Sequence, residues 1–301
     1  MKLATTTGDF SAYSRSQTDC IDWIHQAGFR YLDYNFGTDY ADHSGSMTDE
    51  WQSYLAQVLE FARARGMQFV QAHSPMGSPI IKNDQYPAFI AATKRCIESC
   101  AVLGIPNLVV HSGYESGLTK EEAFDRNRDF FLDLLAVAER CGVNILVENF
   151  NKMYKPDVYW IDNAADLRAL IDYVDHPLFH AVWDAGHGNM QDMPQDESLR
   201  ILGHHVRALH IQDNYGDSDI HLAPFFGTLN LDSLMHGLQD INYQGYFTFE
   251  SGNILLPASK RRPYETDTRL KRAPLDLRIK AEQFLYESGK CILNAYDCFE
   301  E

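Results

Sequence analysis

Strand-like and helix-like segments alternate along the whole chain, and this alternation most constrains the fold. Eight strand–helix pairs follow one another within 301 residues. Regular alternation of this kind favours a parallel sheet, and strands that are apolar almost throughout, such as residues 179–184, indicate burial on both faces. Eight repeats in a chain of this length favour closure, so we predict a (β/α)8 TIM barrel.

The predicted elements cover nearly the whole chain. The strands are placed at residues 2–7, 30–36, 67–73, 107–111, 143–148, 179–184, 206–210 and 245–250. The helices are placed at residues 17–27, 48–65, 86–103, 119–140, 162–173, 196–203, 231–240 and 275–288. With 45% hydrophobic content and no low-complexity linker, we predict one barrel domain over residues 1–301 with a C-terminal helical extension.

Six consecutive predicted strands each end on a side chain that can bind a metal ion. These residues are His73, His111, Glu148, Asp184, His210 and Glu250, spaced by 26 to 40 residues. In a barrel the C-terminal strand ends meet at one mouth, so the six residues are expected to form one site. A single histidine or glutamate in such a place is more often a capping or hydrogen-bonding residue. Six in succession favour a functional site.

The chemistry of this set points to one divalent ion. Glu148, Asp184, His210 and Glu250 offer oxygen ligands and one nitrogen, which suit Mn²⁺ first and Mg²⁺, Co²⁺ or Zn²⁺ as alternatives. Such an ion polarises a carbonyl and stabilises an enediolate, while a nearby carboxylate moves a proton at the adjacent carbon. Further candidates are His187, three residues after Asp184, and the pair Asp219 and His221, which share one face of an extended segment.

Several of these segments carry a family resemblance. LVEN, WDAGH, the stretch from HIQDN to DIHLAP with Gly227, and FTFES resemble the xylose isomerase-like TIM barrel superfamily, within it the sugar isomerase/epimerase and endonuclease IV-like group. The resemblance implies that Glu148, Asp184, His210 and Glu250 bind one ion and that Glu148 and Glu250 are the catalytic acid–base pair. It implies that His187 holds a substrate oxygen. Substrate contacts are also expected from His73, His111, Asp219 and His221.

The expected function is therefore a metal-dependent sugar isomerase or epimerase acting on a keto or aldehydo sugar or a derivative. The first alternative is a lyase or dehydratase acting on a keto-sugar, a keto-inositol or an oxidised glycoside. It is suggested by Phe225 and Phe226, which stand where related sugar enzymes often have a glycine-rich turn. These two rings could stack on a sugar or an aromatic aglycone, or pack against a neighbouring helix or subunit.

The second alternative is an endonuclease IV-like phosphodiesterase with three zinc ions. The resemblance gives its ligands as His73, His111, Glu148, Asp184, His187, His210, Asp219, His221 and Glu250. The formal net charge of −16 argues against a nucleic-acid partner, because binding to phosphates requires lysine and arginine. The small-molecule carbohydrate substrate is therefore preferred.

Composition gives further expectations about partners and location. No signal peptide or membrane span is evident, so we expect a cytoplasmic protein without a membrane partner. The resemblance implies that the chain could form a homo-oligomer. The basic residues between Lys260 and Arg272 could bind an acidic substrate group or form a solvated or subunit-contacting loop, and Tyr154 and Trp160 are further stacking candidates.

Overall fold

The computed structural model describes residues 1–77, 79–151, 159–255 and 272–301. Its eight strands form one sheet in the order β7-β6-β5-β4-β3-β2-β1-β8, and every pair of neighbours is parallel. The strands are β1 Lys2–Thr6, β2 Tyr31–Asn35, β3 Gln68–His73, β4 Asn107–Val110, β5 Asn144–Glu148, β6 Phe179–Asp184, β7 Val206–His210 and β8 Tyr246–Phe249.

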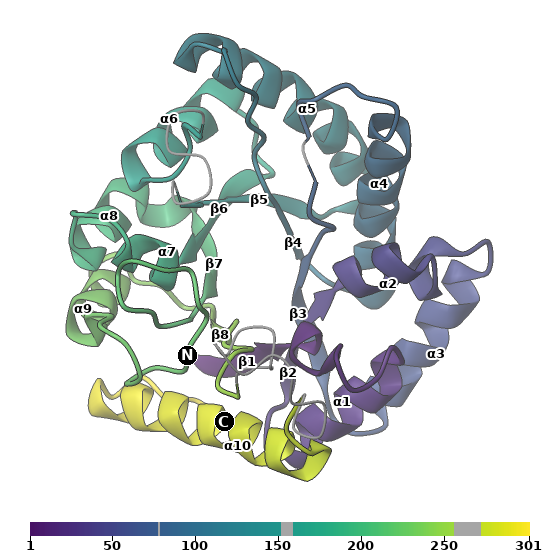
Figure 1. The fold of residues 1–301 in the computed structure, drawn as a ribbon, viewed down its shortest axis with the longest axis vertical. Helices are drawn as coiled ribbons and strands as arrows, with labels where there is room; N and C mark the ends of the chain where they lie inside the picture. The colour runs from purple at the N-terminus through teal and green to yellow at the C-terminus, as the bar shows by residue number, and fades with distance from the viewer. Residues whose placement is uncertain (78, 152–158, 256–271) are drawn as a thin grey trace.

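The two edge strands, β7 and β8, meet just beyond the end of β7. A parallel bridge joins Ile211 to Phe249. The Ile211 N–H donates to the Thr248 carbonyl at 2.8 Å, and the Glu250 N–H donates to the Ile211 carbonyl at 3.0 Å. The sheet therefore forms a nearly closed barrel surrounded by helices (Figure 1), and the predicted (β/α)8 barrel is confirmed.

The helices form the outer ring in Figure 1. They are α1 Gln17–Gln26, α2 Phe36–Asp42, α3 Trp51–Arg63, α4 Tyr86–Leu103, α5 Lys120–Cys141, α6 Ala164–Val174, α7 Ala185–Asn189, α8 Gln195–Leu202, α9 Leu231–Asp240 and α10 Leu275–Ala295. Short 3-10 helices occupy Thr7–Phe10, Gly45–Met47 and Gly203–His205. In the part of the chain that the structure describes, no helix is both long and apolar enough to cross a bilayer.

Some predicted boundaries are wrong. The second strand ends at Asn35, because the Asn35 side chain accepts from the Thr38 N–H and starts α2 at Phe36. The last helix continues to Ala295, seven residues beyond the predicted end at 288. The short helices α2 and α7 were not predicted, because one or two turns carry too little periodicity to be recognised.

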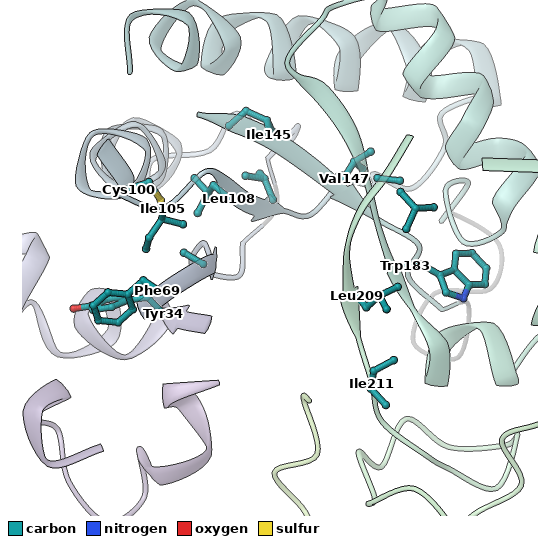
Figure 2. Close-up of a cluster of buried hydrophobic side chains, with 14 of the residues drawn as sticks. Tyr34, Phe69, Cys100, Ile105, Leu108, Ile145, Val147, Trp183, Leu209 and Ile211 are labelled. Atoms are coloured by element: carbon teal, nitrogen blue, oxygen red, sulfur yellow. The ribbon is translucent and has the colours of Figure 1, made fainter. Parts of the chain in front are cut away.

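The core has two parts that together position the mouth of the barrel. The larger part fills the space between strands and helices, and Figure 2 shows some of its side chains, including Tyr34, Phe69, Leu108, Ile145, Val147 and Trp183. The smaller part lies inside the barrel and consists of Val109, Leu146, Val182 and Ala208. Because side chains alternate along a strand, the residues two positions later also point inward, at the C-terminal mouth.

Candidate metal centre

Four side chains from four consecutive strand ends converge at the C-terminal mouth. Glu148 ends β5, Asp184 ends β6, His210 ends β7, and Glu250 follows directly after β8. Each offers one ligand atom, and these atoms lie within 4.8 Å of one another. His210 Nδ1 is 3.0 Å from Glu148 Oε1 and 3.5 Å from Glu250 Oε2. The structure thus brings together the four residues predicted to bind a metal ion.

The environment of these four residues suits a cation. Glu148, Asp184 and His210 are at most 1% exposed. Glu148 Oε2 and Asp184 Oδ2 have no hydrogen-bond partner among the described residues. Within the same residues, the ion pairs of Glu148, Asp184 and Glu250 are all made with histidines and none with lysine or arginine. Burying carboxylates without a cation is costly, so three carboxylates and one imidazole fit a divalent ion held at this place.

Asp33, which the sequence analysis missed, orients the imidazole of His210. Its Oδ2 lies 3.5 Å from His210 Nε2 and accepts a 2.8 Å hydrogen bond from Gln71 Nε2. This contact turns His210 Nδ1 toward Glu148 and Glu250. Metal-binding histidines commonly have such a carboxylate behind them, because it fixes the ring and raises its basicity. The available signal was a carboxylate inside the strand YLDYN.

Hydrogen bonds hold Asp184 through its backbone and through Oδ1. They leave Oδ2 without a hydrogen-bond partner among the described residues. The Asp184 N–H donates to Asn149 Oδ1 at 2.8 Å, and Asn149 Nδ2 donates to the Asp184 carbonyl at 3.0 Å. The Asp184 side chain caps α7, since its Oδ1 accepts from the His187 N–H at 2.6 Å. The short helix after β6 therefore fixes both Asp184 and His187.

Two further histidines lie against Glu148. His111, one residue beyond β4, has its Nε2 3.1 Å from Glu148 Oε2 and 3.0 Å from His73 Nε2. His73, at the end of β3, has its Nε2 3.6 Å from Glu148 Oε2, and its Nδ1 donates a 2.7 Å hydrogen bond to the Ser74 carbonyl. His73, Glu148 and His210 also form a set with metal-binding spacing.

A third set of potential ligands consists of His187, Asp219 and His221. His187 Nε2 lies 3.3 Å from Asp219 Oδ2, and His221 Nε2 lies 3.1 Å from Asp219 Oδ1. His221 also contacts the Glu250 carbonyl through Nδ1 at 2.8 Å. All nine residues that the trinuclear alternative requires therefore come together at one mouth.

The carboxylates and imidazoles of this cluster shift one another's pKa values. Burial raises the pKa of Glu148, but His210 and His111 outweigh that effect and hold it well below its ordinary value. Burial, with Glu148 and Glu250 nearby, raises the pKa of Asp184 to about 6. For His187, burial lowers the pKa, yet the carboxylates of Asp184 and Asp219 raise it to about 10. His187 Nδ1 donates to the Asn149 carbonyl at 2.8 Å, and its Nε2 has no hydrogen-bond partner among the described residues.

A cavity of about 540 Å³ opens over this cluster, and one of its walls is aromatic. Its lining includes Tyr114, Phe150 and Tyr159, which the sequence analysis did not select. The Phe150 ring lies 5.1 Å from the rings of both His111 and His187. The cavity thus pairs acid–base groups with a surface on which a sugar ring or an aromatic group can stack.

The predicted aromatic pair Phe225 and Phe226 does not line this cavity. Phe225 is 61% exposed, and Phe226 packs edge-on against Phe284 of α10 with ring centroids 5.6 Å apart. The contact of Phe226 with a neighbouring helix matches one of the two alternatives predicted for it. Tyr154 and most of the basic 260–272 stretch lie outside the described residues.

Comparisons with known proteins agree with this architecture. Residues 21–270 match the family model of the xylose isomerase-like TIM barrel. An uncharacterized protein of Methanocaldococcus jannaschii, MJ1311, is 26% identical over 193 residues, which cover 62% of this chain and 65% of that protein. The fructoselysine 3-epimerase of Escherichia coli O157:H7 is 30% identical over 141 residues, or 46% of this chain and 49% of the epimerase.

Solved structures share the fold over almost the full chain. A D-tagatose 3-epimerase-like protein superposes with a TM-score of 0.74 at 19% identity, covering 99% of this chain and 100% of that one. The probable 3-DHS dehydratase AsbF of Bacillus anthracis superposes with a TM-score of 0.70 at 13% identity, covering 95% and 99%. At these identities the likeness shows the common fold, and this fold carries more than one chemistry.

Proposed function

Because the chain belongs to the xylose isomerase-like TIM barrel family, we propose that it is a divalent-metal-dependent epimerase or isomerase of a keto or aldehydo sugar or sugar derivative. The observation that carries this proposal is the convergence of Glu148, Asp184, His210 and Glu250 without a lysine or arginine partner among the described residues. The partial match to a fructoselysine 3-epimerase supports the same class of reaction.

In this proposal Glu148, Asp184, His210 and Glu250 hold one ion, preferably Mn²⁺. When bound there, the ion would polarise the substrate carbonyl and stabilise negative charge on its oxygen. Glu148 ends β5 and Glu250 directly follows β8, with His210 Nδ1 between them. One carboxylate removes the proton from the carbon next to the carbonyl, and the other returns a proton from its own side.

The remaining polar residues would orient the substrate. His187, whose Nε2 has no hydrogen-bond partner among the described residues, binds a substrate oxygen. His73, His111 and the Asp219–His221 pair face the same cavity and are placed to bind hydroxyl groups. The aromatic wall at Phe150 excludes water from one side, which strengthens these electrostatic interactions.

Solvent deuterium uptake tests the proton transfer. Wild-type protein loaded with Mn²⁺ is incubated in D2O with a panel of keto sugars, and label at the carbon next to the carbonyl is measured by NMR. Glu148→Gln and Glu250→Gln are expected to abolish uptake, while Glu287→Gln, an exposed glutamate on α10, leaves it unchanged. Full uptake in both active-site variants would refute the mechanism.

A lyase or dehydratase is the second candidate, and the aromatic wall favours it. A cavity of about 540 Å³ that contains Tyr114, Phe150 and Tyr159 has room for an aromatic group next to the sugar. The same proton abstraction would then expel water or an aglycone from the neighbouring carbon. Product analysis by mass spectrometry separates the two reactions, because epimerisation conserves substrate mass and elimination does not.

The presence of three potential ligand sets at one mouth favours a trinuclear phosphodiesterase as the remaining candidate. The net charge of −16 argues against it, so our proposal keeps a small carbohydrate and no nucleic acid as the partner. Metal analysis of protein purified without added metal or chelator decides the point. About one ion per chain supports the sugar enzyme, and three zinc ions would support the phosphodiesterase. A cytoplasmic location and a homo-oligomeric assembly remain part of the proposal.

A further inference from the structure

The barrel has a second polar end, at the N-terminal ends of the same strands. Asn107, Asn144 and His180 precede Val109, Leu146 and Val182 by two residues on β4, β5 and β6, so they point into the same bore. On β7 the register shifts between the pairs Ala181–Val206 and Val182–Ala208, which leaves Arg207 as the extra residue. The apolar layer therefore separates two polar ends, one of which is the candidate metal centre.

These residues open into a cavity of about 760 Å³ on the N-terminal face. Its polar lining includes Asn107, Asn144, His180, His204, Arg207 and Gln244. No aspartate or glutamate lines it among the residues that the structure describes, although the chain as a whole carries a net charge of −16. The cavity is therefore a local region of neutral and positive groups on an acidic protein.

His180 is the buried group of this cavity. It is 9% exposed, and its Nδ1 has no hydrogen-bond partner among the described residues. Burial lowers the pKa of His180 to about 4, and Arg207, His205 and His204 act in the same direction. The imidazole thus sits in a positive potential with a free nitrogen, an arrangement that disfavours a further cation and favours an anion.

Two more donors are available at the same place. The Arg207 side chain forms no hydrogen bond or ion pair with another described residue, and its guanidinium can bind an oxyanion with two parallel hydrogen bonds. Asn144 Nδ2 donates to Asn107 Oδ1 at 2.9 Å, which leaves the Asn107 amide hydrogens free to donate. The cavity therefore contains a charged donor, Arg207, and a neutral donor, Asn107, that no acceptor among the described residues satisfies.

We propose that the N-terminal end of the barrel binds a small oxyanion, a carboxylate or phosphate group, through Arg207, His180 and Asn107. The site is independent of the proposed function, because His180 lies four positions before Asp184 on β6, a distance of about 13 Å along a strand. Binding of the anion stabilises the protonated His180 ring and raises its pKa toward the ordinary value.

Calorimetric titration with inorganic phosphate, and separately with succinate, tests the site on the metal-loaded protein. We expect saturable binding of at least one of them at one site per chain. Arg207→Gln should weaken that binding on the order of tenfold to a hundredfold, the effect of losing a charge-assisted hydrogen bond. Arg63→Gln, an exposed arginine on α3 with the same charge change, serves as the matched control. Which anion binds more tightly distinguishes a phosphate site from a carboxylate site.

Histidine ring NMR provides a second measurement on the wild-type chain. The His180 resonances, assigned with His180→Gln, should move on anion addition and report a higher pKa, while those of His73 and His210 remain unchanged. The proposal is overturned if neither anion gives saturable binding, or if Arg207→Gln binds as tightly as Arg63→Gln. Movement of the His73 and His210 resonances alone would place the anion at the metal centre and would overturn it equally.

Discussion

Two buried charge clusters lie near each other in this barrel, and they are neutralised differently. In the arginine cluster, formed by Asp9, Arg278 and Glu282, the Arg278 guanidinium lies 3.0 Å from Asp9 and 2.8 Å from Glu282. The Thr5 hydroxyl adds a further hydrogen bond to this cluster, donating to Glu282 Oε1 at 2.6 Å. In the metal cluster, formed by Glu148, Asp184, His210 and Glu250, the carboxylates form ion pairs only with histidines among the described residues.

The difference separates structure from function. The arginine cluster carries its own cation and anchors α10 to the loop after β8, since Arg278 Nη1 also donates to the Gly252 carbonyl at 3.1 Å. In the metal cluster, Glu148, Asp184 and Glu250 have no lysine or arginine ion-pair partner among the described residues, and we propose that a cation from outside completes it. Substitutions in the arginine cluster should therefore lower the free energy of unfolding. Substitutions in the metal cluster should reduce metal binding and activity.

The largest expected effect concerns Glu148. Glu148→Gln keeps the shape of the side chain but removes both a ligand charge and a proton acceptor, so kcat should fall by about 10³-fold or more. Steady-state kinetics and metal content per chain measure this effect. Glu282→Gln provides the comparison, because it changes a buried glutamate of the arginine cluster and should leave metal content intact. Loss of metal in both variants would remove the distinction between the clusters.

Arg278→Met should produce the largest loss of stability. It leaves Asp9 and Glu282 buried without their cation, which typically costs about 3–5 kcal/mol of unfolding free energy. Urea unfolding of the metal-loaded protein measures it, with Arg63→Met as an exposed control. An unchanged urea midpoint would mean that the arginine cluster contributes little to the fold.

Removal of the metal ion should destabilise the wild-type protein by a smaller amount. A ligand present at 100 times its Kd stabilises the folded state by about 2.7 kcal/mol, so a chelator should lower the unfolding free energy by this order. Urea unfolding with and without chelator measures the difference. Glu148→Gln should show little response to the chelator, whereas a response equal to that of wild type would place the ion elsewhere.

Asp33→Asn should weaken metal binding without abolishing it. Asp33 orients His210 from behind, and loss of such a contact costs about 10- to 100-fold in metal affinity. Competition with a fluorescent chelator gives the Kd. Asp22→Asn, which alters an aspartate on the outer helix α1, is the control and should bind metal as the wild type does. Equal affinities in both variants would show that Asp33 has no part in the site.

The smallest expected effect is a pH dependence of the arginine cluster, where two carboxylates share one arginine. Burial and the nearby Glu282 raise the pKa of Asp9 well above its ordinary value, despite Arg278. A folded-state pKa above the unfolded one means that stability is lost as the pH rises through the folded value. Asp9→Asn should therefore gain stability relative to wild type as the pH rises above about 4, the pKa of an unfolded aspartate. A stability difference that does not change with pH would contradict this assignment.

The sequence predicted the fold and the strand-end residues well, because both rest on local patterns. Helical periodicity and glycine stops locate the elements, and a charged residue after an apolar strand is visible without knowledge of its neighbours. Asp33 was missed because a single carboxylate inside a strand acquires its role only from His210, which is far away in the sequence. Phe150 was missed for a similar reason. The aromatic wall of the cavity, to which Phe150 belongs, forms only because β5 lies between β4 and β6.

By itself, the sequence determined the alternation of eight strands with their main helices and which ligand types stand at the strand ends, but not the short helices α2 and α7. Only the tertiary structure decided which atoms meet: His210 Nδ1 with Glu148 and Glu250, Asp33 behind it, and Thr5 against Glu282, 277 positions away. The reason is physical. Backbone conformation follows from short-range sterics and side-chain periodicity, whereas the contacts of a buried charge depend on the register and closure of the sheet, which no local pattern contains.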